Sequence, residues 1–125
     1  MSVTFSGGGV TISGGGWTLE APPSVVSKKA IFGYGTSSGS NDVSMTNLVS
    51  NTGVVATDTT GVGTARQQLA AAGYGTDTAI FGYGLNTAFT RVSMTNLVSN
   101  TGVVATDTTG VGTGRNNLAA ASYGS

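Results

Sequence analysis

The sequence has neither cysteine nor histidine, and these two absences remove several kinds of functional site. Without cysteine, the chain can form no disulfide and no thiolate metal centre. Without histidine, it lacks the commonest general base and the commonest metal ligand. Its five acidic residues are scattered, and none belongs to a dense acidic loop that would bind calcium. We therefore expect no metal, no cofactor and no enzymatic activity.

Charge is scarce as well. Five basic and five acidic residues make up 8% of the 125 residues, and the net charge is zero. Nucleic-acid binders concentrate positive charge, so we expect no nucleic-acid partner. No apolar run is long enough to span a membrane, and the first residues do not read as a secretory signal. We expect no membrane association, and a protein kept in the cytoplasm or in a particle assembled there.

Glycine is abundant, with 21 residues, and proline occurs only twice. The glycines lie between short apolar runs, a pattern typical of turns in an all-β chain. Residues 43–64 recur without a single change as residues 92–113, an offset of 49 from Val43 to Val92. The same offset relates residues 30–35 to residues 79–84. Such a period indicates a duplicated structural unit of a solenoid, propeller or array.

Four strand-like segments are expected in each unit. In the most complete copy they are residues 66–74, 79–83, 91–98 and 103–106. Residues 75–78 (Gly-Thr-Asp-Thr) suit a hairpin loop between the first two segments. No segment has convincing helical periodicity. Four strands in a unit of this length match one blade of a β-propeller.

These segments resemble kelch repeats. Arg66 with residues 69–72 resembles the first conserved strand of a kelch blade, and residues 80–84 resemble the glycine-terminated strand that follows. Gly-Tyr-Gly stands where kelch repeats have Gly-Gly, and the tryptophan of the outer strand is missing. The resemblance implies an all-β, kelch-like domain over residues 30–125 with about two four-stranded blades.

Two blades cannot close a ring of roughly four to eight. The chain enters and leaves the repeat in the middle of a blade, so that its first and last pieces together make one blade. We therefore expect a homo-oligomer, with a trimer favoured because it would give a six-bladed ring completed between neighbouring chains. Two alternatives stay open: partial blades that pair within one chain or with another protein, and an intertwined trimeric β-fibre.

The first 19 residues carry a smaller repeat of apolar–Thr–apolar triplets separated by Ser-Gly-Gly-Gly. These triplets predict very short strands, which become stable only by adding to another sheet. We interpret residues 1–19 as a docking arm and residues 20–29, with two adjacent prolines, as a linker. A disordered Gly/Ser-rich leader is the alternative. The apolar docking residues are Val3, Phe5, Val10, Ile12, Trp17 and Leu19.

Two sets of repeated side chains are candidate functional residues. Tyrosines flanked by glycine or serine have open ring faces, which suit packing on a neighbouring blade or stacking on a sugar; they are Tyr34, Tyr74, Tyr83 and Tyr123. Asp58 and Asp107 begin equivalent Asp-Thr-Thr-Gly turns and should accept backbone hydrogen bonds there. Arg66 and Arg115 are equivalent too, and we expect them to bind backbone carbonyls or to pair with these aspartates between blades.

The motifs AIFGYG, TNLVSNTGVVATDTTGVGTAR and LAAAGYG are also similar to repeats in hypothetical virion appendage or fibre proteins of tailed bacteriophages, notably marine ones. This resemblance implies a structural virion component, such as a fibre, collar or capsid decoration, assembled in the host cytoplasm. The arm would dock on other virion proteins, and the repeat head would project for host attachment. The alternative is a lectin-like carbohydrate-binding module made of two-blade protomers. The two readings overlap if the appendage binds host-surface glycans.

Overall fold

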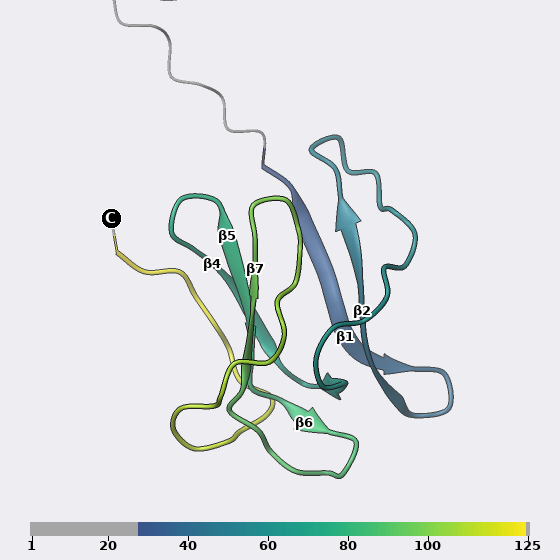
Figure 1. Ribbon diagram of the computed structural model, residues 1–125, viewed down its shortest axis with the longest axis vertical. Coiled ribbons are helices and arrows are strands. Elements are labelled where there is room, and N and C mark those ends of the chain that lie inside the picture. Colours follow the sequence, from purple (N-terminus) through teal and green to yellow (C-terminus); the bar gives the residue numbers. More distant parts are fainter. Residues whose placement is uncertain (1–27, 125) are drawn as a thin grey trace, which may run out of the picture.

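The computed structural model describes residues 28–124, which form seven strands in three small antiparallel sheets (Figure 1). The all-β prediction is confirmed, because these residues contain no helix. It follows that no helix within residues 28–124 could cross a membrane. The predicted docking arm, with Val3, Phe5, Val10, Ile12, Trp17 and Leu19, and the linker up to residue 27 lie outside the described residues.

The first repeat unit begins with a hairpin. Strand β1 (Ala30–Ser37) pairs with β2 (Asn41–Val49), from Ala30 opposite Val49 to Ser37 opposite Asn41. The register shifts between Gly33 and Gly35, because Tyr34 between them adopts a left-handed conformation with φ 62°. This β-bulge removes the tyrosine from the ladder and re-aims its side chain.

The second unit contains a three-stranded sheet in the order β4 (Ala70–Tyr74), β5 (Thr78–Gly82) and β7 (Thr95–Val98). The predicted hairpin between the first two strands is confirmed, with Tyr74 opposite Thr78. Two further short strands, β3 (Arg66–Gln67) and β6 (Leu85–Asn86), form a separate pair.

Several predicted strand bounds are wrong. The segment 66–74 is divided into β3 and β4, because Gln68 has φ 56° and interrupts the extended backbone. Of residues 91–98, only 95–98 form a strand, and residues 103–106 are reduced to the single bridge of Val104 with Val98. The equivalent bridge in the first unit joins Val55 to Val49. The fourth segment of each unit therefore lies beside the third without forming a regular ladder.

No closed propeller or barrel is detected among residues 28–124. Figure 1 shows the β1–β2 hairpin on one side of the β4–β5–β7 sheet and the yellow C-terminal segment on the other. Contacts link all three parts. The Tyr34 ring meets Phe81 edge-on with 5.2 Å between ring centroids, and the Ser122 hydroxyl donates to the carbonyl of Gly73. The three parts thus lie side by side in the order in which they occur in the sequence.

The apolar core lies between the two units and is small. Its buried members are Tyr34, Phe81, Val98 and Val104. Two polar side chains, Arg66 and Asn96, are fully buried beside it. A buried charge is costly unless it is paired and hydrogen-bonded, so the surroundings of Arg66 determine how the two units fit together.

Candidate functional site

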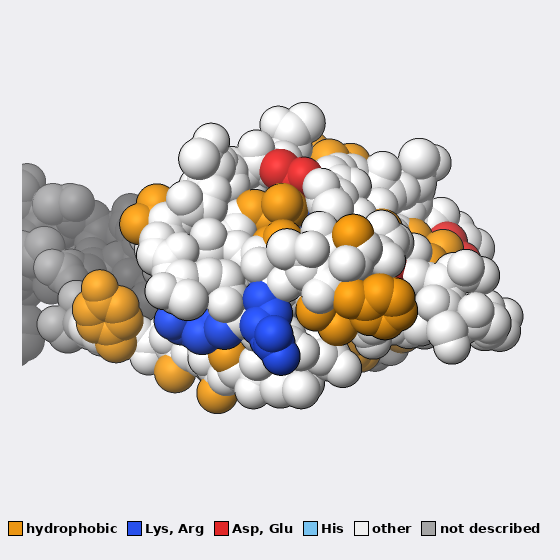
Figure 2. All heavy atoms as spheres, turned by 90° about the horizontal axis from the view of Figure 1, so that it is seen from below, with side chains coloured by type: hydrophobic (Ala, Val, Ile, Leu, Met, Phe, Trp, Pro, Cys, Tyr) orange, Lys and Arg blue, Asp and Glu red, His pale blue; other side chains and the backbone are white. Residues whose placement is uncertain are grey.

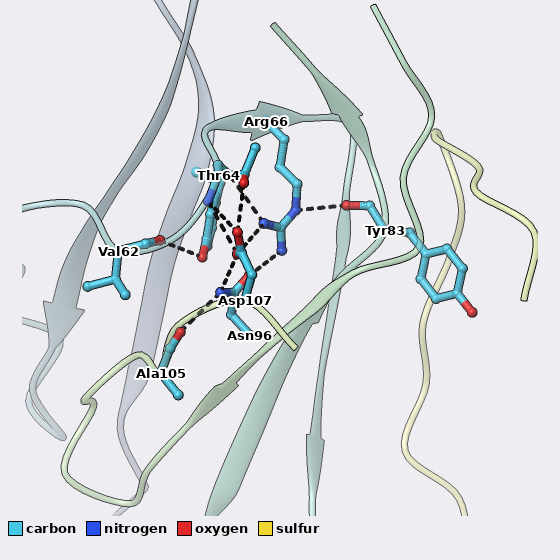
Figure 3. Close-up of polar contacts among 8 residues, drawn as sticks. Val62, Thr64, Arg66, Tyr83, Asn96, Ala105 and Asp107 are labelled. Atoms are coloured by element: carbon cyan, nitrogen blue, oxygen red, sulfur yellow. Dashed lines mark hydrogen bonds and ion pairs between the residues drawn. The ribbon is translucent and has the colours of Figure 1, made fainter. Parts of the chain in front are cut away.

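Arg66 lies at the centre of the candidate site, and its guanidinium binds groups from both repeat units (Figure 3). Nε donates to the carbonyl of Tyr83 at 2.9 Å, and Nη1 donates to the carbonyl of Thr64 at 3.2 Å. Nη2 donates to Oδ1 of Asn96 at 2.5 Å. All three nitrogens therefore have an oxygen partner, which is the condition for burying an arginine.

The ring of Tyr34 covers one face of this guanidinium, with Arg66 Cζ 4.4 Å from the ring centroid, a cation–π contact. The Tyr34 hydroxyl donates to the carbonyl of Val62 at 3.0 Å. Burial raises the pKa of Tyr34 above its ordinary value, although the charge of Arg66 acts in the opposite direction. Tyr34 therefore remains a neutral donor, and its ring, held between Arg66 and Phe81, is not open to a sugar.

Asp107 supplies the negative charge of the site. Its Oδ1 lies 3.7 Å from Arg66 Nη1, and its Oδ2 accepts hydrogen bonds from the Thr64 amide at 2.9 Å and hydroxyl at 2.7 Å. Asn96 Nδ2 donates to Oδ1 at 2.9 Å. Burial raises the pKa of Asp107, but the bonds from Thr64 and Asn96 and the charge of Arg66 together lower it below its ordinary value. The carboxylate is thus held ionised.

Gly63 allows this close approach. It has φ +75°, and a Cβ there would collide with Asp107 Oδ1 and lie 2.7 Å from Asn96 Nδ2.

Burial also lowers the pKa of Arg66, an effect that Tyr34 and Asp107 partly offset. Within residues 28–124, no buried side-chain nitrogen or oxygen is left without a hydrogen-bond partner. We call Tyr34, Thr64, Arg66, Asn96 and Asp107 the arginine joint.

The arginine joint connects the two units. Tyr34 and Thr64 come from the first unit, and Arg66, Asn96 and Asp107 come from the second. The structure thus brings the predicted Arg66 and Asp107 together beside Thr64 and Tyr34 of the first unit. The carboxylate of Asp107 bonds to Thr64, 43 residues earlier, and to Asn96, rather than to the amides of its own turn as the sequence suggested.

The equivalent residues Arg115 and Asp58 are not brought together. Arg115 is exposed and stacks over Tyr83, with Cζ 4.5 Å from the ring centroid. Asp58 is exposed and accepts a bond from Asn47 Nδ2 at 2.7 Å. Within residues 28–124, neither therefore has the ion-pair partner that its equivalent has in the arginine joint.

The remaining candidate tyrosines lie near the C-terminal segment. Tyr74 is partly exposed and Tyr123 is fully exposed, and both line a shallow groove between β4 and residues 121–124. A second groove, of about 910 Å³, separates the β1–β2 hairpin from the three-stranded sheet, and its walls include Ile31, Leu48 and Ile80. The part of the chain that the structure describes has no group of three or more residues able to hold a metal ion.

Sequence reasoning did not single out Thr64 or Asn96. A signal for Asn96 was available, because the alternation of residues 92–98 places this asparagine on the same face as Val92, Met94 and Val98. A polar residue on a core-facing side needs a buried partner. Thr64 gave no comparable signal, since its role depends on a long-range contact.

Comparison of the chain with protein-family models, with curated proteins and with solved structures found no match.

Proposed function

We propose that this chain is a structural, non-catalytic component of a bacteriophage virion, such as a fibre, collar or capsid decoration. Its repeat domain assembles with other copies, and residues 1–19 dock on neighbouring virion proteins. The observation that carries the proposal is the arginine joint. Its charged and amide groups bond to one another and to backbone carbonyls, which is the arrangement of a clamp between structural units.

The surface supports a role in assembly. Figure 2 shows a face on which uncharged groups predominate and hydrophobic side chains are scattered. Large exposed hydrophobic side chains include Phe32, Phe89 and Val111. In the proposed assembly, some of these side chains would become buried against neighbouring chains. We propose neither a nucleic-acid nor a membrane partner.

A kelch-like propeller is the architecture we propose for the assembled head. The order β4–β5–β7, with the segment around Val104 and Thr108 bridged to β7, gives four antiparallel chain segments in meander order. That is the layout of one propeller blade. A trimer of two-blade chains would close a six-bladed ring.

The virion assignment is tested on purified phage particles. Mass spectrometry should recover this chain from particles banded in a density gradient, and immunogold labelling should place it at one appendage or on the capsid surface. Recovery from the lysate alone, with none in intact particles, would contradict a structural role in the virion.

Exposed tyrosines favour a second candidate, a lectin-like carbohydrate-binding module. Tyr123 and Tyr74 line one groove with exposed ring surface, and aromatic faces of this kind stack on sugars. A glycan array probed with the full chain tests this candidate. Binding that is lost in Tyr123→Ala but kept in a Phe89→Ala control would favour it, and an array without signal would contradict it.

A further inference from the structure

The repeat equivalents of the residues in the arginine joint are divided between two faces of the domain. The donor face comprises Tyr83, Thr113, Arg115 and residues 119–123. The acceptor face comprises Phe32, Asn47, Asp58 and the free edge of β1. Every side chain named on either face is the repeat equivalent, 49 positions away, of a residue that lies at the internal boundary.

The side chains of the donor face have the same arrangement as their equivalents in the arginine joint. Arg115 stacks over Tyr83 at 4.5 Å, as Arg66 stacks over Tyr34 at 4.4 Å. The Tyr83 hydroxyl donates to the carbonyl of Val111 at 3.2 Å, matching the internal bond from Tyr34 to Val62 at 3.0 Å. Arg66 has no exposed surface, whereas Arg115 is exposed and its guanidinium has no hydrogen-bond acceptor within residues 28–124.

The acceptor face is preorganised in the same way. Asn47 Nδ2 donates to the carbonyl of Ala56 at 3.2 Å and to Asp58 at 2.7 Å, as Asn96 donates to Ala105 at 3.0 Å and to Asp107 at 2.9 Å. This orientation leaves the Asn47 oxygen free to accept, as the Asn96 oxygen accepts from Arg66.

The apolar neighbour follows the same pattern. Phe81 packs on Tyr34 at the internal boundary and is 4% exposed, whereas the equivalent Phe32 is 62% exposed. If Tyr83 of another copy packed on Phe32 as Tyr34 packs on Phe81, the Phe32 ring would be covered in the same way. Phe32 is therefore exposed because it lacks the tyrosine contact that Phe81 makes.

Backbone pairing completes the match. Strand β5 is paired on both sides, by β4 and β7, whereas the equivalent strand β1 is paired only with β2. Residues 119–123 are equivalent to β4 and have no strand partner within the described chain. An unpaired strand edge readily accepts an added strand.

We propose that a second copy of this chain docks head to tail, so that Arg115 of one copy enters between Asn47 and Asp58 of the next. Residues 119–123 then add to the free edge of β1 in the register of β4 on β5, which places Ala119 opposite Gly33 and Ala121 opposite Ile31 of the next copy. The inference rests on the proposed self-assembly and specifies its surfaces. A head-to-tail contact makes a closed ring or an open array, depending on the rotation per copy.

A second copy is the occupant because it supplies each group that the internal joint uses, at the same spacing and with complementary charge. Residues 1–27 are another segment that could cover the acceptor face. If the full chain stayed monomeric and formed oligomers only after residues 1–27 were deleted, those residues would be what covers the acceptor face in the full chain. That result would overturn the proposal.

The decisive experiment mixes two full-length variants. Arg115→Ala removes the donor face and leaves the acceptor face intact, whereas Asp58→Arg does the opposite and finds no charge to pair with on the donor face of the alanine variant. Each variant alone should have the mass of a 12.3 kDa monomer by light scattering after size exclusion. Their equimolar mixture should form a 1:1 dimer and nothing larger, because only one competent interface exists. Phe89→Arg, a charge change at an exposed side chain outside both faces, should keep the wild-type mass.

A second measurement covers the case in which a variant fails to fold. The natural chain has no cysteine. An Ala121→Cys chain mixed with an Ile31→Cys chain should therefore form one specific intermolecular disulfide under mild oxidation, whereas Phe89→Cys paired with Ile31→Cys should not.

The possible failures are distinguishable. If the wild type assembles but Arg115→Ala and Asp58→Arg assemble equally well, these faces are wrong and self-assembly stands. If the wild type is a monomer at all concentrations, both are wrong. Neither result depends on whether the chain is recovered from virions.

Discussion

The two copies of the exact repeat have the same sequence in different surroundings. Val104 in the second copy is 9% exposed, whereas Val55 at the same position of the first copy is 53% exposed. Asn96 is fully buried in the internal joint, and Asn47 is only partly buried on the acceptor face. The side chains and their local hydrogen bonds match, so the differences at these two positions come from what packs against them in each copy. Identical residues should therefore differ greatly in their effect on stability.

The largest difference is expected between Arg66→Ala and Arg115→Ala. Removing Arg66 leaves the Asn96 oxygen and the carbonyls of Thr64 and Tyr83 without their donor and should lower the free energy of unfolding by about 3 kcal/mol. Removing the exposed Arg115 should change the unfolding of the isolated chain by less than about 0.5 kcal/mol. Urea denaturation at a protein concentration low enough to prevent association measures both. Equal effects of the two substitutions would contradict the distinction between the internal joint and the donor face.

The two phenylalanines give the next largest difference. Phe81→Ala removes a buried ring from the core and should cost about 3 kcal/mol, with a cavity left against Tyr34. Phe32→Ala removes a ring that is mostly exposed and should cost under about 1 kcal/mol in the isolated chain. Thermal unfolding followed by circular dichroism compares them. A large destabilisation by Phe32→Ala in the dilute chain would show that this ring packs within its own protomer.

A third pair separates backbone strain from packing. Gly63 and Gly112 share the left-handed conformation, with φ +75° and +78°, so alanine at either position carries a similar backbone cost of about 1 kcal/mol. Only Gly63→Ala must also displace Asp107, whereas a Cβ on Gly112 would have just the Tyr83 hydroxyl nearby, at 3.9 Å. Gly63→Ala should be the more destabilising by about 1–2 kcal/mol in urea denaturation. Equal losses would mean that the close approach to Asp107 contributes nothing.

Acid should produce the smallest effect. Because the pKa of Asp107 is lower in the folded chain than in the unfolded one, its contribution is complete above the unfolded value of about 3.9 and is lost as pH falls through the folded pKa. The side chain is partly exposed, so the contribution should be under about 1 kcal/mol. Asp107→Asn should flatten the acid limb of a stability–pH curve. An unchanged acid limb in this variant would contradict the assigned ionisation.

The sequence was sufficient to predict the β-class, the duplicated unit and the hairpin around residues 75–78, because each depends on local patterns. It also placed Arg66 and Asp107 among the residues expected to form contacts between blades, with backbone carbonyls as the alternative partners of the arginine. It could not predict that Tyr34 adopts φ 62° and turns its ring under Arg66, since a bulky residue rarely takes that conformation. Nor could it predict the bonds from Thr64 to Asp107, which join residues 43 positions apart. These features follow from the packing of one unit on another, which repetition alone does not specify.

The most direct test compares the two arginine side chains in the full-length protein by nitrogen-15 NMR. Nε–H of Arg66 donates to the carbonyl of Tyr83 at a buried boundary, so its hydrogen should exchange slowly with solvent. If the donor face completes the same joint with a second copy, Nε–H of Arg115 should be protected to a similar degree, and Asp58→Arg should abolish its protection but not that of Arg66. Slow exchange at Arg66 together with fast exchange at Arg115 in the concentrated wild-type protein would contradict the account.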